Sequence, residues 1–255
     1  MDKYAMTAYM AARTHLNAGI FYLLPRYLLR ALHLVPLLFL WQALMQSGVK
    51  ADMQLSQMLT YTYMAALLAP MLNIQTPLTG WLYEGQVLSC YLRPMGVLRH
   101  VAAQTFGEML PSLMLFTLPM LFLGPVLGIS VLPHSAWFAL SLMLCAALGL
   151  AIDFLFACLM LHMMNGRWLL YNLRSCTTWL LSGTLIPFAL LPWGLGDVLS
   201  LTPFASMGGA VLALYVGISS PLSVIALQLF WNALLWPLAI FAFKKSSQRM
   251  VSHGG

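Results

Sequence analysis

The side chains that could carry proton transfer or metal binding in this sequence are few and widely separated. Asp153 lies inside a long apolar stretch, where an ionised acid costs roughly 2.5–3.5 kcal/mol on membrane-insertion scales. His162 lies further along the same stretch. A membrane-embedded enzyme acting on lipid or peptide needs several acid, base or metal-binding groups that converge at one depth, and only these two residues offer themselves. The sequence therefore disfavours an intrinsic enzyme and predicts no catalytic residue.

Motifs that bind nucleotides or metal ions are absent from the sequence. It contains no GxxxxGK[ST] stretch that would hold ATP phosphates, no HExxH, no GxSxG and no metal-spaced cysteine and histidine cluster. Its cysteines form no CxxC pair, and we expect them to be reduced structural thiols: Cys90, Cys145, Cys158 and Cys176. We therefore expect no cofactor and no metal ion in this chain.

The role of Asp153 has three interpretations from the sequence alone. It forms a structural ion pair with His162, Arg167 or Arg174, it lines a polar transport path, or its protonation is coupled to transport. Other uncharged polar residues in apolar stretches either line such a path or bond between helices. The candidate path residues are Thr60, Tyr63, Asp153, Thr178 and Ser182.

Composition defines the environment of these residues. Charged residues make up 7% of the 255 residues, against about 25% in an average soluble protein, and the mean hydropathy is +0.85. The net charge of +6 is scattered between apolar stretches and does not form the polar basic face that nucleic acid requires. The sequence predicts one all-α integral membrane domain over residues 1–255, without room for a soluble module. An energy source would come from another chain.

Long apolar stretches recur six times, and each predicts a transmembrane helix, since roughly 20 mostly apolar residues cross a bilayer. We place them at residues 32–46, 55–74, 106–129, 136–164, 173–190 and 222–243. Of the twelve Lys and Arg residues, all except Lys50 lie in the terminal segments or in the second and fourth loops. Because short basic loops stay in the cytosol, we expect both termini to be cytoplasmic.

Two further segments have a distinctive pattern. Residues 4–25 place apolar side chains on one helical face, which predicts a helix lying on the membrane, or else a frayed terminus. Residues 186–216 are too apolar for an aqueous loop but are interrupted by several prolines and glycines. This pattern predicts a re-entrant helical segment before the last span, or else two plain extracellular turns.

The second loop, residues 77–94, predicts a short cytosolic helix over residues 81–92, which ends at Arg93 and Pro94. Such a helix would gather Val87, Leu88, Tyr91 and Leu92 on one side and display charged residues to water. It would dock a soluble partner, or else serve as an interfacial tether without a partner.

The order of these motifs resembles the membrane subunits of bacterial ATP-binding cassette exporters of the type-two permease family. Residues 84–94 look like the glycine followed by leucine-arginine-proline that comes after the second span in one branch. Ser182-Gly, Ile186-Pro187, Leu191-Pro192-Trp193 and Thr202-Pro203-Phe204 are similar to the proline-broken segment before the last span of that family. A basic tail that ends in Gly-Gly also fits.

The resemblance implies roles for particular residues. The helix over 81–92 would be a coupling helix in a groove of an ATPase chain, with a second contact at residues 165–174. The coupling residues would be Trp81, Glu84, Val87, Leu88, Tyr91, Arg93 and Arg167. The extracellular exit gate would comprise Ile186, Pro187, Pro192, Trp193, Pro203 and Phe204.

The resemblance also implies the setting and the partners. The chain would lie in the bacterial cytoplasmic membrane and pair with a second permease, identical or related. ATP and Mg²⁺ would be bound by separate ATPase chains. Driven by them, it would export an amphipathic or hydrophobic drug, peptide or lipid-like molecule by alternating access. The alternatives are a membrane-embedded enzyme acting on lipid or peptide, and a membrane anchor or channel that works without an ATPase.

Overall fold

Apolar runs separated by glycine and proline fold into successive helices in the computed structural model of the chain. It describes residues 2–17, 19–47, 53–160 and 167–254, and these contain no strand. The elements are α1 (Lys3–Leu16), α2 (Ile20–Gln46), α3 (Leu55–Leu72), α4 (Leu78–Glu84), α5 (Val87–Tyr91), α6 (Val97–Ser112), a π-helical turn η1 (Leu113–Thr117), α7 (Leu118–Leu123), the 3-10 turn η2 (Pro125–Leu127), α8 (Trp137–Met160), α9 (Arg167–Leu181), the 3-10 turn η3 (Phe188–Leu190), α10 (Leu195–Ser200), α11 (Pro203–Met207), α12 (Gly209–Tyr215) and α13 (Pro221–Gly254).

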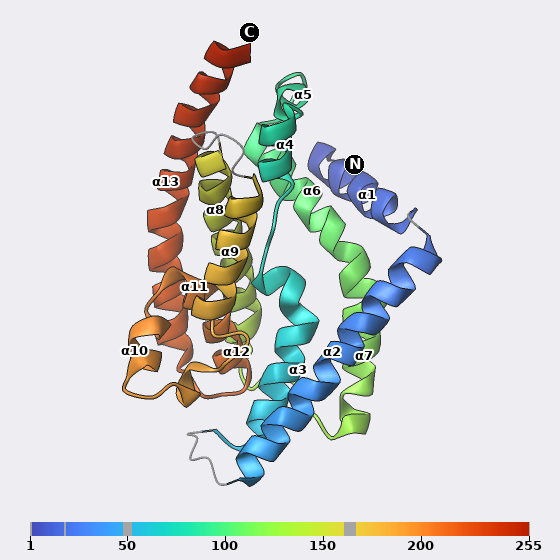
Figure 1. The fold of residues 1–255 in the computed structure, drawn as a ribbon, viewed down its shortest axis with the longest axis vertical. Coiled ribbons are helices and arrows are strands. Elements are labelled where there is room, and N and C mark those ends of the chain that lie inside the picture. Colours follow the sequence, from blue (N-terminus) through green and yellow to red (C-terminus); the bar gives the residue numbers. More distant parts are fainter. Residues whose placement is uncertain (1, 18, 48–52, 161–166, 255) are drawn as a thin grey trace.

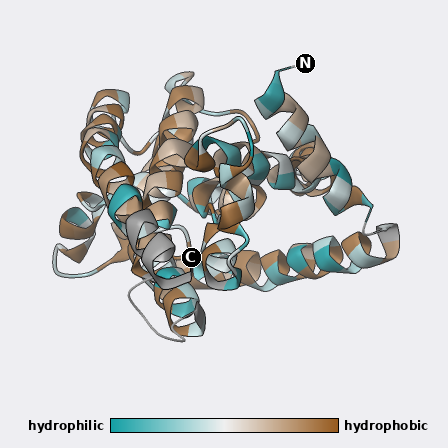
Figure 2. Ribbon diagram, turned by 90° about the horizontal axis from the view of Figure 1, so that it is seen from above, coloured by the Kyte–Doolittle hydropathy of each residue, from teal (hydrophilic) through white to brown (hydrophobic). Residues whose placement is uncertain are grey.

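The long helices run roughly along one axis and define two ends of the molecule (Figure 1). The start of α1, the short helices α4 and α5 and the end of α13 lie toward one end, which we call the α5 end. The turn η2 and the helices α10 and α12 lie toward the other, which we call the α10 end. Both termini are thus directed to the α5 end. Apolar residues run along most of the helical ribbon in Figure 2, as expected for helices surrounded by lipid.

Among the described residues, four helices are long and apolar enough to cross a membrane. They are Phe21–Gln46, Val97–Leu127, Trp137–Leu159 and Pro221–Ser246. They correspond to the first, third, fourth and sixth of the predicted spans. The other two predicted spans correspond to α3, with 18 residues, and α9, with 15 residues, and neither is among these four.

The prediction of one interfacial helix over residues 4–25 is wrong, because the chain breaks between α1 and α2. Gly19 has φ +88°, a left-handed conformation that glycine adopts without steric cost. The apolar helix α2 therefore begins at Ile20, well before residue 32. It includes Arg30, whose guanidinium donates to Ser112 Oγ at 3.1 Å and to the Ala66 carbonyl at 2.7 Å. These bonds within the protein explain how a basic residue is tolerated in an apolar helix.

Helix α1 packs closely against α6 through a glycine. A Cβ atom built on Gly107 would lie 2.2 Å from the Ala8 carbonyl oxygen, a separation that real Cβ atoms do not show. Lys3 Nζ adds a bond to the Pro94 carbonyl at 2.8 Å. The face of α1 that the sequence assigned to the membrane is thus partly used for protein packing, and Ala12 is buried there.

A Gly107→Val variant is expected to detach α1 from α6 while leaving the rest of the fold in place, because the added side chain meets backbone that cannot move aside. We expect amide hydrogen exchange within α1 to become about tenfold faster or more, as for a locally opened segment. The control is Gly96→Val, where an added Cβ has no neighbour within 4 Å. Equal protection of α1 in both variants would contradict the close packing.

Candidate functional site

The segment predicted to form a coupling helix folds into two short helices, α4 and α5, rather than one. Gly85 has φ +72° and separates α4 from α5, so the prediction of a continuous helix over 81–92 is wrong. The left-handed conformation that this glycine readily adopts ends α4, as at many helix C-termini. The side-chain arrangement therefore also differs from that of a single helix.

Residues on the inner side of this helix pair anchor it to the rest of the molecule. Val87 and Cys90 are buried, together with Leu82 of α4. Trp81 stacks on the His100 ring with centroids 5.9 Å apart, and Arg93 Nη1 lies 2.7 Å from His100 Nε2. Burial raises the pKa of the Cys90 thiol, and the nearby Arg93 charge opposes this effect. Cys90 is therefore a packing residue.

The outer side of the same pair presents apolar residues to solvent. Leu88, Tyr91 and Leu92 are 52%, 51% and 89% exposed. We call this surface the α5 tip. Of the four residues predicted to cluster, only Val87 is buried. Glu84 and Gln86 are exposed, and a hydrogen bond of 2.8 Å joins their side chains.

Some residues with predicted roles lie outside what the structure describes. Arg167 begins α9, but its side chain is not described, and neither are Lys50 and residues 161–166, which include His162.

The segment leading into α4 is tied to α8 and α9 by a buried ion pair. Arg174 Nε lies 2.7 Å from Asp153 Oδ1, and the two side chains are only 5% and 4% exposed. Asp153 Oδ2 accepts from the Thr76 amide at 2.9 Å and from the Thr76 hydroxyl. Arg174 donates to Asn73 Oδ1 at 3.1 Å and to the Ile74 carbonyl.

This arrangement connects parts that are far apart in the sequence. Asp153 belongs to α8, Arg174 to α9, and residues 73–76 link α3 to α4. Of the three cations proposed as partners for Asp153, the structure pairs it with Arg174. A cavity of about 260 Å³ adjoins the pair and is also lined by Glu108. Asp153 therefore fixes the start of α4 relative to the long helices.

The residues of the predicted transport path lie in different parts of the described structure, and Thr60 and Asp153 line two different cavities. Thr60 lines a cavity of about 190 Å³ near His134, at the α10 end. Tyr63 is buried and donates to the Met120 carbonyl. Thr178 is buried in α9, and Ser182 is buried just after the end of that helix, where its Oγ pairs with Thr184 Oγ1 at 2.8 Å. The hydrogen bond of Tyr63 joins α3 to α7, and that of Ser182 is local to the segment after α9. Both side chains therefore have a structural role.

The predicted exit-gate residues lie in the irregular segment at the α10 end. Pro187 is buried, whereas Ile186 and Trp193 are 46% and 92% exposed. Pro192 is also exposed, and Pro203 and Phe204 are half-buried at the start of α11. Trp193 is also the single non-glycine residue with positive φ in the described part of the chain, at 59°.

Close backbone contacts hold this segment against α3. The Gly209 amide donates to the Ser182 carbonyl at 2.6 Å, and Tyr61 donates its hydroxyl to the Gly183 carbonyl at 2.6 Å. We call these four residues the Tyr61 contact. It leaves no room for a side chain at Gly209, where an added Cβ would lie 2.7 Å from the Ser182 oxygen.

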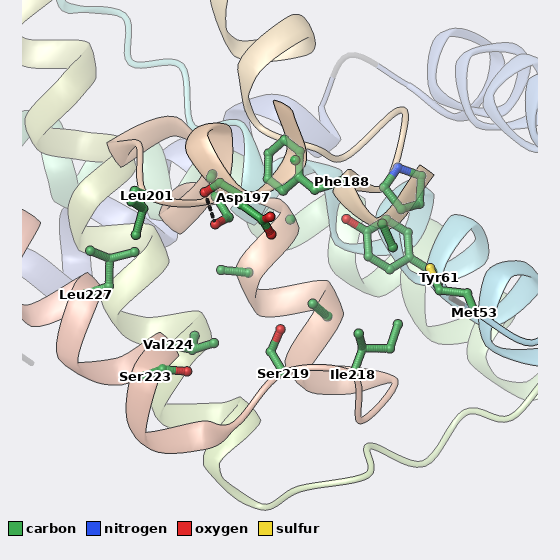
Figure 3. Close-up of a pocket in the computed structure, with 18 of the residues that line it drawn as sticks. Met53, Tyr61, Phe188, Asp197, Leu201, Ile218, Ser219, Ser223, Val224 and Leu227 are labelled. Atoms are coloured by element: carbon green, nitrogen blue, oxygen red, sulfur yellow. Dashed lines mark hydrogen bonds between the residues drawn. The ribbon is translucent and has the colours of Figure 1, made fainter. Parts of the chain in front are cut away.

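Beside this contact lies a cavity of about 640 Å³ (Figure 3). Its walls are the segment 187–201, the helices α11 and α12, the start of α13, and Met53 and Tyr61 near the start of α3. Most lining side chains are apolar or small, and Asp197 supplies a carboxylate. We call it the α10 cavity.

Several residues of these sites were not singled out from the sequence. Asp197 carried a signal, because it is the only formally charged residue between positions 182 and 220. Gln228 is one of two amide side chains in the last apolar stretch, which was also a signal, and it donates to the Ser206 and Ser141 carbonyls at 2.9 and 3.2 Å. Thr76 had no such signal, since its role depends on a distant partner. Asn73 was recognisable as a polar residue of the second predicted span, and it bonds to Arg174 of α9.

Comparison with protein-family models, with curated proteins and with solved structures finds no match for this chain. Within the described ranges, no group of three or more His, Cys, Asp or Glu residues is placed to hold a metal ion. The helical structure with four candidate membrane-crossing helices defines the class, a membrane protein.

Proposed function

We propose that this chain is the permease subunit of an ATP-binding cassette transporter that exports an amphipathic or hydrophobic molecule. Hydrolysis of ATP with Mg²⁺ takes place on separate ATPase chains, and a second permease, identical or related, completes the pathway. The observation that carries the proposal is the α5 tip, an exposed apolar surface whose supporting segment is tied to two long helices by a buried ion pair.

In this proposal the chain crosses the bacterial cytoplasmic membrane six times, with α3 and α9 adding to the four longer helices. The α5 end faces the cytosol, because the basic residues Lys3, Arg93, Arg99, Lys244 and Lys245 belong to elements at that end. The α10 end then faces outward, and the segment 186–216 is re-entrant. Its broken backbone is satisfied by contacts such as Gly209 to Ser182.

The α5 tip is the docking surface for the ATPase in this mechanism. Leu88, Tyr91 and Leu92 offer apolar side chains that a groove can bury, and exposed apolar groups at an aqueous end are typical of binding sites. A conformational change of the ATPase can act on the helices only through contacts that differ between its states. Residues 73–76 provide the physical connection, since Asp153 and Arg174 hold them.

The test is co-purification of ATPase activity with the chain from its native membranes. We expect Mg²⁺-dependent ATPase activity to co-purify with the wild-type chain. For the double variant Leu88→Asp, Tyr91→Asp we expect the co-purifying activity to be at least about tenfold lower, because charged groups oppose burial in an apolar groove. The control is Leu132→Asp, 81% exposed and near the α10 end. Absence of ATPase from the wild type, or full retention by the α5-tip variant, would refute the proposal.

A further inference from the structure

The α10 cavity has the size and lining of a small-molecule site. Its volume of about 640 Å³ is in the range of roughly 300–1,000 Å³ typical of ligand pockets. Phe188, Leu201, Leu227 and Phe230 supply large apolar surfaces. Phe188 and Leu201 belong to the segment 187–201, and Leu227 and Phe230 belong to α13. Figure 3 shows Phe188, Leu201 and Leu227 among the lining side chains.

Small residues create the empty space. Gly209, Ala210 and Ala213 of α12 line the cavity, where larger side chains would fill it. Gly196 is required on the opposite wall, because a Cβ there would lie 2.3 Å from the Phe188 carbonyl oxygen. The cavity is thus maintained by tight backbone packing behind its walls.

The only formal charge on the described lining is negative. Asp197 lines the cavity from α10, and none of the lining residues is Lys or Arg. In the described part of the chain no basic side chain pairs with the Asp197 carboxylate. A carboxylate without a basic partner in the protein attracts a cation to this side of the cavity.

We propose that the α10 cavity binds a cationic amphiphile, with its apolar body against Phe188, Leu201 and Leu227 and its positive group beside Asp197. That the bound molecule is the exported substrate rests on the proposed function. Ser219, just before α13, lines the cavity and offers a hydroxyl to polar groups of the ligand (Figure 3). An anionic amphiphile finds no basic partner on this lining.

Binding is tested on the full chain in lipid nanodiscs without any ATPase, using fluorescence anisotropy. The cationic probe is rhodamine 6G, the neutral probe is Nile red, and empty nanodiscs give the partition background. Asp197→Asn is expected to weaken rhodamine 6G binding about tenfold and to leave Nile red binding unchanged, because only the charge interaction is lost. Ala213→Phe is expected to weaken both probes, because it fills the cavity.

Three results would overturn the inference. They are rhodamine 6G binding equal to that of empty nanodiscs, equal affinity of the wild type and Asp197→Asn, and unchanged binding in Ala213→Phe. Thermal unfolding of each variant verifies that it is folded, and Asp197→Asn, at an exposed position, is expected to unfold as the wild type does. Since no ATPase is present, failure here is separate from failure of the ATPase co-purification experiment.

Discussion

Replacing Asp153 by Ala is expected to destabilise the protein by about 3–5 kcal/mol, because one partner of a buried ion pair would be removed. The Arg174 guanidinium would remain, 5% exposed, without its counter-charge. The Thr76 amide and hydroxyl would lose their acceptor as well. A buried unpaired charge and two unsatisfied donors each oppose folding.

The measurement is thermal unfolding of the purified chain in detergent, together with the yield of monodisperse protein. The matched control is the double variant Asp153→Leu, Arg174→Met, which removes both charges. We expect it to cost less than the sum of the single variants Asp153→Leu and Arg174→Met, because residues in contact do not contribute additively. Additive losses, or a stable Asp153→Ala protein, would show that the ion pair contributes little.

The same variants test the proposed mechanism. If residues 73–76 connect the α5 tip to α8 and α9, the double variant is expected to retain ATPase association but to lose transport per ATP hydrolysed. Wild-type stoichiometry of transport in a folded double variant would exclude the ion pair from the connection. A merely structural pair would change stability alone.

The second large effect is expected at Gly209. A Gly209→Val side chain would collide with the Ser182 carbonyl at 2.7 Å and with the Tyr61 hydroxyl at 3.1 Å. The backbone of two segments would have to separate, breaking both hydrogen bonds of the Tyr61 contact. Overpacking of this kind costs about 1–3 kcal/mol, and more where backbone must move.

Ala210→Val is the matched control, because it enlarges the next residue of α12, which lines the open α10 cavity. We expect the unfolding temperature to fall clearly for Gly209→Val and to change little for Ala210→Val. Tyr61→Phe is expected to give an intermediate loss, since it removes one of the two bonds. Equal behaviour of Gly209→Val and Ala210→Val would contradict the close approach of α12 to residue 182.

The local sequence pattern predicted most of the helices. It misplaced helix ends where a single glycine interrupts the helix. The apolar runs predicted the four long helices, but Gly19 and Gly85 each split a predicted helix, because nothing in the periodicity distinguishes a tolerated glycine from one with positive φ. For Asp153, one of the interpretations from the sequence was a structural ion pair, with Arg174 among the candidate partners, and the structure shows that pair. Hydropathy can flag such an acid but cannot choose its partner.

The parts that sequence reasoning missed depend on distant neighbours. Thr76 contacts Asp153 across 77 positions, and Gln228 reaches the Ser141 carbonyl across 87. Neither separation leaves a trace in local composition. The α10 cavity is formed by several segments, so its existence followed only from the packed structure, although the isolated charge of Asp197 marked the place.

Helix α8 has a consequence for how the two ends of the molecule influence each other. It carries Asp153 and packs along α13, whose first turns form a wall of the α10 cavity. If occupancy of the cavity shifts α13, thermodynamic reciprocity requires that a bound cationic amphiphile and a docked ATPase change each other's dissociation constant by the same factor. Ligand titrations at fixed nucleotide, and nucleotide titrations at fixed ligand, should then yield one shared value.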